Sequence, residues 1–129
     1  MIYIKRAYEP PSAEDGQRFL IDRLWPRGTS KDTLRIEAWL KELAPSDALR
    51  QFFQHDPAKW PAFRKRYLAE LRARPAGLDE LVAAARAGPV TLVYGARDEL
   101  HNNAVVVRDY LTRRVRAGSR RAPSRSHAR

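Results

Sequence analysis

The chain has 129 residues, a formal net charge of +10 and no cysteine. This length predicts one domain with its own core, and the lack of cysteine excludes disulfides, thiolate catalysis and cysteine-ligated zinc. No apolar run approaches the roughly 18–20 residues of a membrane span, and the N-terminal MIYIKRAY lacks the order of a signal peptide. We therefore expect a cytoplasmic protein that does not enter a membrane.

The basic charge is concentrated at the C-terminal end. From Thr112 onward there are seven arginines and no acidic residue, whereas the preceding part holds 18 of the 25 basic residues and all 15 acidic ones. After Gly118 no side chain is large and apolar, so this end cannot contribute to a core. We expect a single α/β domain at 1–111, a last helix that runs to about 116, and a disordered Arg-rich tail at 117–129.

The first expected elements are two strands. Ile2–Arg6 (IYIKR) is rich in β-branched and aromatic residues. After a Pro-containing loop, residues 17–25 form the second strand, whose apolar run at 19–21 is typical of a strand covered on both faces. Pro26 removes a backbone donor and Gly28 permits a left-handed turn, so the strand should stop there.

Two adjacent charges, Asp22 and Arg23, interrupt this apolar strand. Charges in such a strand are costly unless they are paired or hydrogen-bonded. Neighbouring strand residues point to opposite faces, so the two cannot satisfy each other. We expect Asp22 to have a cationic or N–H partner and Arg23 to have an acceptor.

Four helices are expected next, followed by a third strand and a last helix. The helical spacing of apolar residues and the capping residues place these helices at about 32–44, 47–54, 57–74 and 78–87. Gly88-Pro89 ends the fourth, Val90–Tyr94 (VTLVY) is a strand, and the last helix begins near Glu99. The predicted fold is α/β: a small, at least partly parallel sheet of about three strands, with four to five helices packed on it.

The loops at two strand ends are the expected place of a ligand site. In open α/β sheets, ligands bind beyond the carboxyl ends of parallel strands. The second strand ends in WPRGTSK and the third in GARDELHNN, which makes the site electropositive and suited to an anion. The candidates for ligand binding are Arg23, Arg27, Lys31, His55, Arg97 and Asn102, and those for proton transfer are Asp22, Asp98 and His101.

Several of these candidates also have purely structural interpretations. Asp98 is equally suited to cap the last helix, and His55 precedes Asp56-Pro57 at a helix terminus. The basic face of helix 57–74 is typical of a solvated surface. No nucleotide-binding, nucleophile-elbow or zinc-protease motif is present, and no spacing supports a metal site. The sequence therefore leaves the cofactor, the reaction and the oligomeric state open.

Several motifs together resemble a known family. DRLWPRG at 22–28, the W39…APS46 segment, the aromatic series from F52 to Y67, and TLVYGARD…HN at 91–102 are similar to the YeaO-like branch of the domain-of-unknown-function-488 (DUF488) family. This resemblance covers about residues 1–111 and implies a small bacterial, cytosolic α/β protein without an established activity. Some relatives in the wider family carry cysteine and histidine after the last strand, where this chain has Tyr94, Ala96 and Arg97, so thiol or cysteine–metal chemistry is not carried over.

Two hypotheses of function follow. In the first, the chain binds an anionic small molecule or nucleotide at the strand ends, with catalysis on a phosphorylated substrate as a further hypothesis. In the second, it is a nucleic-acid-associated module that uses the Arg-rich tail and the basic helix face, with backbone-directed, salt-dependent binding. A tail without any function is an equally good interpretation of the seven arginines.

Overall fold

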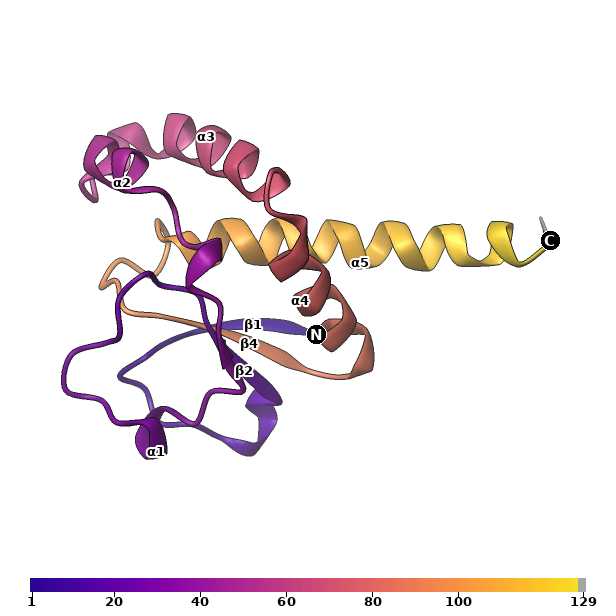
Figure 1. The fold of residues 1–129 in the computed structure, drawn as a ribbon, viewed down its shortest axis with the longest axis horizontal. Coiled ribbons are helices and arrows are strands. Elements are labelled where there is room, and N and C mark those ends of the chain that lie inside the picture. The colour runs from indigo at the N-terminus through magenta and orange to yellow at the C-terminus, as the bar shows by residue number, and fades with distance from the viewer. Residues whose placement is uncertain (128–129) are drawn as a thin grey trace.

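A parallel sheet forms one layer of the molecule (Figure 1). The computed structural model describes residues 1–127, and in them four strands pair in the order β1-β4-β2-β3. The strands are β1 (Ile2–Arg6), β2 (Gln17–Leu20), β3 (Ala38–Trp39) and β4 (Val90–Tyr94). All three pairings are parallel, so the predicted α/β class with a parallel sheet is confirmed and the sheet has one strand more than expected.

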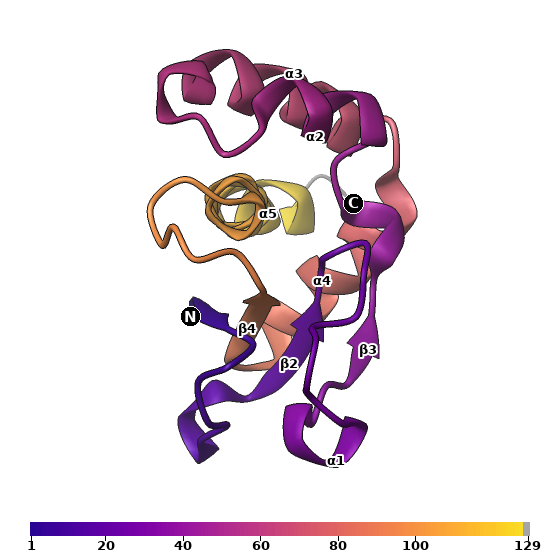
Figure 2. The same ribbon diagram turned by 90° about the vertical axis from the view of Figure 1, so that its left-hand side faces the viewer.

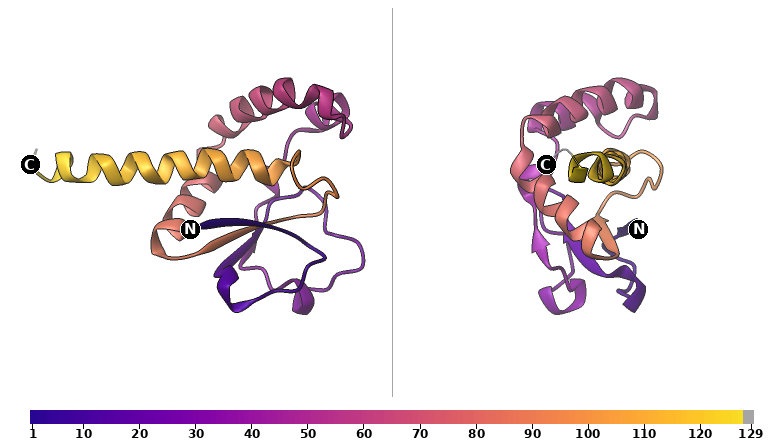
Figure 3. Two further views of the ribbon diagram at one scale, coloured as in Figure 1. Left: turned by 180° about the vertical axis from the view of Figure 1, so that it is seen from behind. Right: turned by 90° about the vertical axis from the view of Figure 1, so that its right-hand side faces the viewer.

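The helices lie mainly on one side of this sheet. They are α1 (Lys31–Leu34), α2 (Asp47–Phe53), α3 (Trp60–Arg72), α4 (Pro75–Ala87) and α5 (Asn103–His127), with 3-10 turns at Ala13–Asp15, Lys41–Leu43 and Pro57–Lys59. Helix α5 lies between the sheet and the α2–α3 pair (Figure 2) and contacts β1, β4, α3 and α4. Seen from behind, α5 continues well past the end of α4 (Figure 3). Across the described residues, no helix combines the length and apolar character needed to cross a membrane.

Each face of the sheet has its own core cluster. The larger cluster joins Phe19, Ile21 and Leu92 to the buried faces of α2 to α5, including Tyr67 and Leu111. The smaller one, on the other face, gathers Ala7, Leu20, Leu34 and Val93, with Trp25, Ile36 and Trp39 packed against it. Because both faces are covered, all five residues of β4 are buried, as the apolar sequence VTLVY predicts.

The prediction of one helix over about 32–44 is wrong. The chain makes only the short α1, then Arg35 adopts a left-handed conformation (φ 51°), and the following residues form strand β3. The N–H of Glu37 donates to the Arg18 carbonyl at 2.6 Å and that of Leu40 to the Leu20 carbonyl at 2.8 Å. Hydrogen bonds to β2 therefore outweigh the local helical spacing, because they satisfy the free edge of the sheet.

Two further element boundaries differ from expectation. Strand β2 ends at Leu20 rather than at residue 25, and Asp22 to Trp25 form an irregular connection. Helix α4 begins at Pro75, because proline suits the first turn of a helix. Its Gly77 permits a close approach, since an added Cβ would lie 3.0 Å from the Leu43 side chain.

At the C-terminal end, the start of the last helix differs from expectation, whereas the expected tail remains a prediction. Helix α5 begins at Asn103 instead of near Glu99 and continues to His127. The disordered Arg-rich tail at 117–129 and the domain limit at 111 remain predictions, and residues 128–129 lie outside the described residues.

A buried ionic cluster holds the N-terminal end of β2. Asp15 accepts from Arg18 Nη1 at 2.7 Å and from Lys5 Nζ at 3.1 Å, and Arg18 Nε donates to the Leu34 carbonyl at 2.9 Å. Burial alone would raise the pKa of Asp15, but hydrogen bonds from Ser12, Lys5 and Arg18 outweigh it and lower the pKa to about 2. The cluster ties β1, the following loop and β2 together.

Candidate functional site

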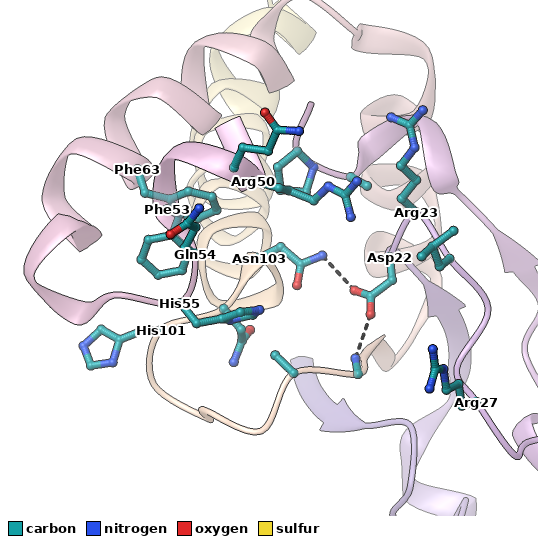
Figure 4. A pocket seen from close by; sticks show the side chains of 17 residues that line it. Asp22, Arg23, Arg27, Arg50, Phe53, Gln54, His55, Phe63, His101 and Asn103 are labelled. Atoms are coloured by element: carbon teal, nitrogen blue, oxygen red, sulfur yellow. Dashed lines mark hydrogen bonds between the residues drawn. The ribbon is translucent and has the colours of Figure 1, made fainter. Parts of the chain in front are cut away.

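A cavity of about 820 Å³ opens at the carboxyl ends of β2 and β4 (Figure 4). The two strands are parallel neighbours, so the loops that follow them leave the same edge of the sheet. Helix α2, the turn after it and one residue of α3, Phe63, form the opposite wall. The cavity therefore lies where the sequence placed the strand-end site.

Asp22 lines this cavity and joins the two loops. Its Oδ2 accepts from the Gly95 N–H at 2.8 Å and its Oδ1 from Asn103 Nδ2 at 2.9 Å, as the dashed lines in Figure 4 show. Asn103 Nδ2 also lies 3.3 Å from the Ile21 carbonyl. Burial raises the pKa of the Asp22 carboxyl above its usual value, against the opposing effects of these hydrogen bonds and of Arg50 and His55. Asp22 thus has the N–H partners expected for it, although it lies just beyond the end of β2.

Three arginines line the cavity: Arg23, Arg27 and Arg50. Arg23 Nη1 lies 3.2 Å from Asp47 Oδ1, and Arg50 Nη2 lies 2.5 Å from the same oxygen. Asp47 is itself exposed, and the bond from Arg50 lowers its pKa. In the part of the chain that the structure describes, Arg27 makes no ion pair, so its charge is not neutralised by a carboxylate.

The turn after α2 brings His55 to the cavity in an unusual backbone conformation. Gln54 (φ 47°) and His55 (φ 55°) are consecutive non-glycine residues with positive φ. Such conformations cost about 1–3 kcal/mol each and persist only where the surrounding structure imposes them. In Figure 4 the His55 ring lies between Phe53 and the Asp22 carboxylate, and its centroid is 6.0 Å from that of Phe53.

His101 and Asp98 form a pair at the edge of the cavity. His101 Nδ1 lies 3.0 Å from Asp98 Oδ2, and the N–H groups of Leu100 and His101 both donate to Asp98 Oδ1. The bond from the Leu100 N–H is the main reason why the pKa of Asp98 is lowered. The His101 ring packs edge-on against Trp60 at 5.2 Å between centroids. Asp98 thus organises the turn before α5 and also orients His101.

The cavity brings together most, but not all, of the residues that the sequence proposed. Asp22, Arg23, Arg27, His55, His101 and Asn102 line it. Lys31, Arg97 and Asp98 do not: Lys31 opens α1, Arg97 is exposed in the loop after β4, and Asp98 reaches the cavity only through His101.

Asn102 has a structural role as well. It is 2% exposed; its side chain donates to the Asp98 carbonyl at 2.8 Å and accepts from the Val105 N–H at 3.1 Å. These bonds cap α5. Asn102 therefore contributes to the cavity wall while its polar atoms are engaged within the turn.

Three further residues, to which the sequence did not point, line the cavity from α2 and its turn: Arg50, Gln51 and Gln54. No local motif marks them, because they meet the strand ends only through tertiary packing. Their one sequence-level indication is the polar pair at 50–51 beside Phe52 and Phe53. Among the described residues no group of three or more His, Asp or Glu side chains could hold a metal ion.

Fold and cavity define the class: a small α/β protein with a parallel sheet and a polar pocket at the strand ends. The chain belongs to the DUF488 family, since the family model described as "Inactive DUF488-N3 subclade" matches residues 1–128. It is 41% identical over 110 residues to "Uncharacterized protein YeaO" of Escherichia coli, covering 85% of this chain and 96% of that protein. It is also 37% identical over 113 residues to "Uncharacterized protein Mb3100c" of Mycobacterium bovis, covering 88% and 95%. No solved structure matches the chain.

Proposed function

We propose that the chain binds a small anionic molecule, such as a phosphorylated metabolite or a nucleotide, in the strand-end cavity. The observation that carries the proposal is the charge of the wall, in which three guanidinium groups face one carboxylate. Asp47 pairs with two of these arginines, and Arg27 makes no ion pair within the described chain. The carboxylate of the wall, Asp22, already accepts two N–H bonds, and its raised pKa makes it easier to neutralise when an anion arrives. The cavity therefore favours negative charge in its ligand.

The roles of the wall residues follow from their contacts. Arg27, without an ionic partner in the described chain, is the first contact for the anion, and Arg50 approaches from the other wall. Asp22 keeps lone pairs for a ligand hydroxyl, because each of its oxygens accepts one bond. The apolar edges of Phe53 and Phe63, whose rings stack at 4.3 Å, suit an uncharged part of the ligand.

A binding role is favoured over catalysis. The family model carries the description "inactive", and the chain has no cysteine to act as a nucleophile. The Asp98–His101 pair is the remaining candidate for proton transfer, and it lies at the cavity edge. We infer a cytoplasmic binding protein for a small anion as the simplest function that this site supports.

The test is a thermal-shift screen of the full chain against inorganic phosphate, sugar phosphates, nucleotides and dicarboxylates. A ligand at a hundredfold excess over its Kd stabilises the fold by about 2.7 kcal/mol. Arg27→Ala should abolish the shift without lowering the melting temperature of the free protein, because Arg27 is exposed. Lys31→Ala is the matched control, since Lys31 lies outside the cavity. A shift that survives in Arg27→Ala, or is lost equally in Lys31→Ala, would show that the ligand binds elsewhere.

A further inference from the structure

A second groove, of about 590 Å³, runs along the exposed side of α3. Four of its residues follow the helical ridge spacing of i, i+4, i+8 and i+12: Trp60, Arg64, Leu68 and Arg72. Pro61 and Lys65 lie beside this row. At 1.5 Å per residue, the row from the first to the last is about 18 Å long. It is separate from the strand-end cavity, although Trp60 contacts His101 at the cavity edge.

The cations of this groove are weakly engaged within the chain. Arg64 Nη2 lies 3.8 Å from Asp109 Oδ2, at the long limit of an ion pair, and both side chains are partly exposed. The Arg72 guanidinium lies 5.9 Å from the centroid of the Tyr110 ring. Lys65 is exposed and makes no ion pair or side-chain hydrogen bond with any described residue. Three positive charges are therefore available to an external polyanion.

The groove also has a fixed aromatic ring at one end. Trp60 is half-buried, and its ring packs at 5.8 Å on Phe53 and at 5.6 Å on Phe63. These neighbours and the edge-on His101 ring hold the indole in place. The part of the half-buried ring that lines the groove can therefore contact a partner at little entropic cost. Leu68 continues the row as a half-buried apolar contact between the basic residues. An aromatic ring in line with cations is the arrangement that single-stranded nucleic acids use for stacking and backbone contact.

We propose that this groove binds single-stranded nucleic acid, with one base stacked near Trp60 and the backbone phosphates on Arg64, Lys65 and Arg72. An acidic peptide would satisfy the charges, but it would not use the aromatic ring. The site is independent of the proposed anion cavity. The described residues that line the groove all belong to α3, whereas the Arg-rich C-terminal segment is far from α3 in the sequence.

Binding is measured with the full chain by fluorescence anisotropy of a labelled oligothymidylate over a series of salt concentrations. For single strands the slope of log K against log salt is about −0.7 per phosphate contact. Lys65→Gln and Arg72→Gln should therefore each reduce the slope by about 0.7 in magnitude. Arg86→Gln, an exposed arginine on α4, is the control with the same change of charge and should leave the slope unchanged.

The aromatic contribution is tested separately. Trp60→Leu keeps an apolar side chain beside Phe53 and should weaken binding about 5- to 150-fold, the range for loss of one base stack. The melting curve of Trp60→Leu shows whether its fold is intact. If the fold is lost, the salt slopes of Lys65→Gln and Arg72→Gln test the proposal. Unchanged slopes in Lys65→Gln and Arg72→Gln would overturn the proposal and assign binding to the C-terminal arginines. Equal competition by polyglutamate at the same charge would also overturn it, in favour of an acidic peptide.

Discussion

Protonation of Asp15 should weaken the fold at acid pH. The pKa of this carboxyl is about 2 in the folded chain, against an ordinary value of 3.8. A lowered pKa stabilises the folded state fully above pH 4, and this contribution is lost as the pH falls from about 4 to about 2. Each unit of pKa difference corresponds to about 1.4 kcal/mol, so the loss amounts to about 2 kcal/mol. Asp15 is 6% exposed, so solvent screening of the cluster is small.

Urea unfolding between pH 5 and pH 2 measures this loss. The wild-type chain is compared with Asp15→Asn, which removes the titrating group and leaves Arg18 without its carboxylate. The variant should be less stable by roughly 3–5 kcal/mol at pH 5. The difference from the wild type should then shrink by about 2 kcal/mol towards pH 2. Parallel stability curves, or an Asp15 that titrates near 3.8 by carbon NMR in the folded wild type, would refute the reasoning.

Two further predictions concern the turns and Asp22 in the cavity. Gly16→Ala should destabilise the fold more than Gly28→Ala in urea unfolding. Both glycines have positive φ (63° and 76°), so alanine is strained by about 1–3 kcal/mol at either position. Only at Gly16 would the added Cβ also lie 2.1 Å from the Pro89 carbonyl oxygen. Equal losses would contradict this. By NMR titration, Asp22 should have a pKa above 3.8 and Asp98 a pKa below 3.8. Saturating phosphate should raise the pKa of Asp22 further. A pKa of Asp22 below that of Asp98 would be incompatible with the burial of Asp22.

Much of the fold could be predicted because local chemistry and tertiary packing agree there. Strands β1 and β4 have the bounds that their β-branched sequences indicate. Ser46 caps α2 and Asp56 caps the turn before α3, each by a side-chain bond to a backbone N–H, as expected of these residue types. The placement of the cavity at the carboxyl ends of parallel strands also follows from chain order, since β2 and β4 are joined through helices.

The composition of the cavity could be predicted only in part. Asp22, Arg27 and His101 belong to loops next to strand ends, and their places follow from the parallel sheet. Lys31 belongs to the same loop sequence, but the segment turns away into α1 and takes it out of the cavity. Arg50 comes from α2, whose position over the sheet depends on the packing of Phe53 and Phe63 and on no local motif.

The sequence by itself determined the elements whose stability is local or whose burial is complete: the capped helices, the two strands at 2–6 and 90–94, and the turn at Gly28. Tertiary structure decided the segment 35–40, where hydrogen bonds to the free edge of β2 replaced a helix by strand β3. It also decided which charges face the cavity, since burial and the partners of Asp22 depend on loops more than 70 residues apart. The physical reason is that hydrogen bonds across a sheet and packing between layers join distant residues, whereas capping and periodicity act only on near neighbours.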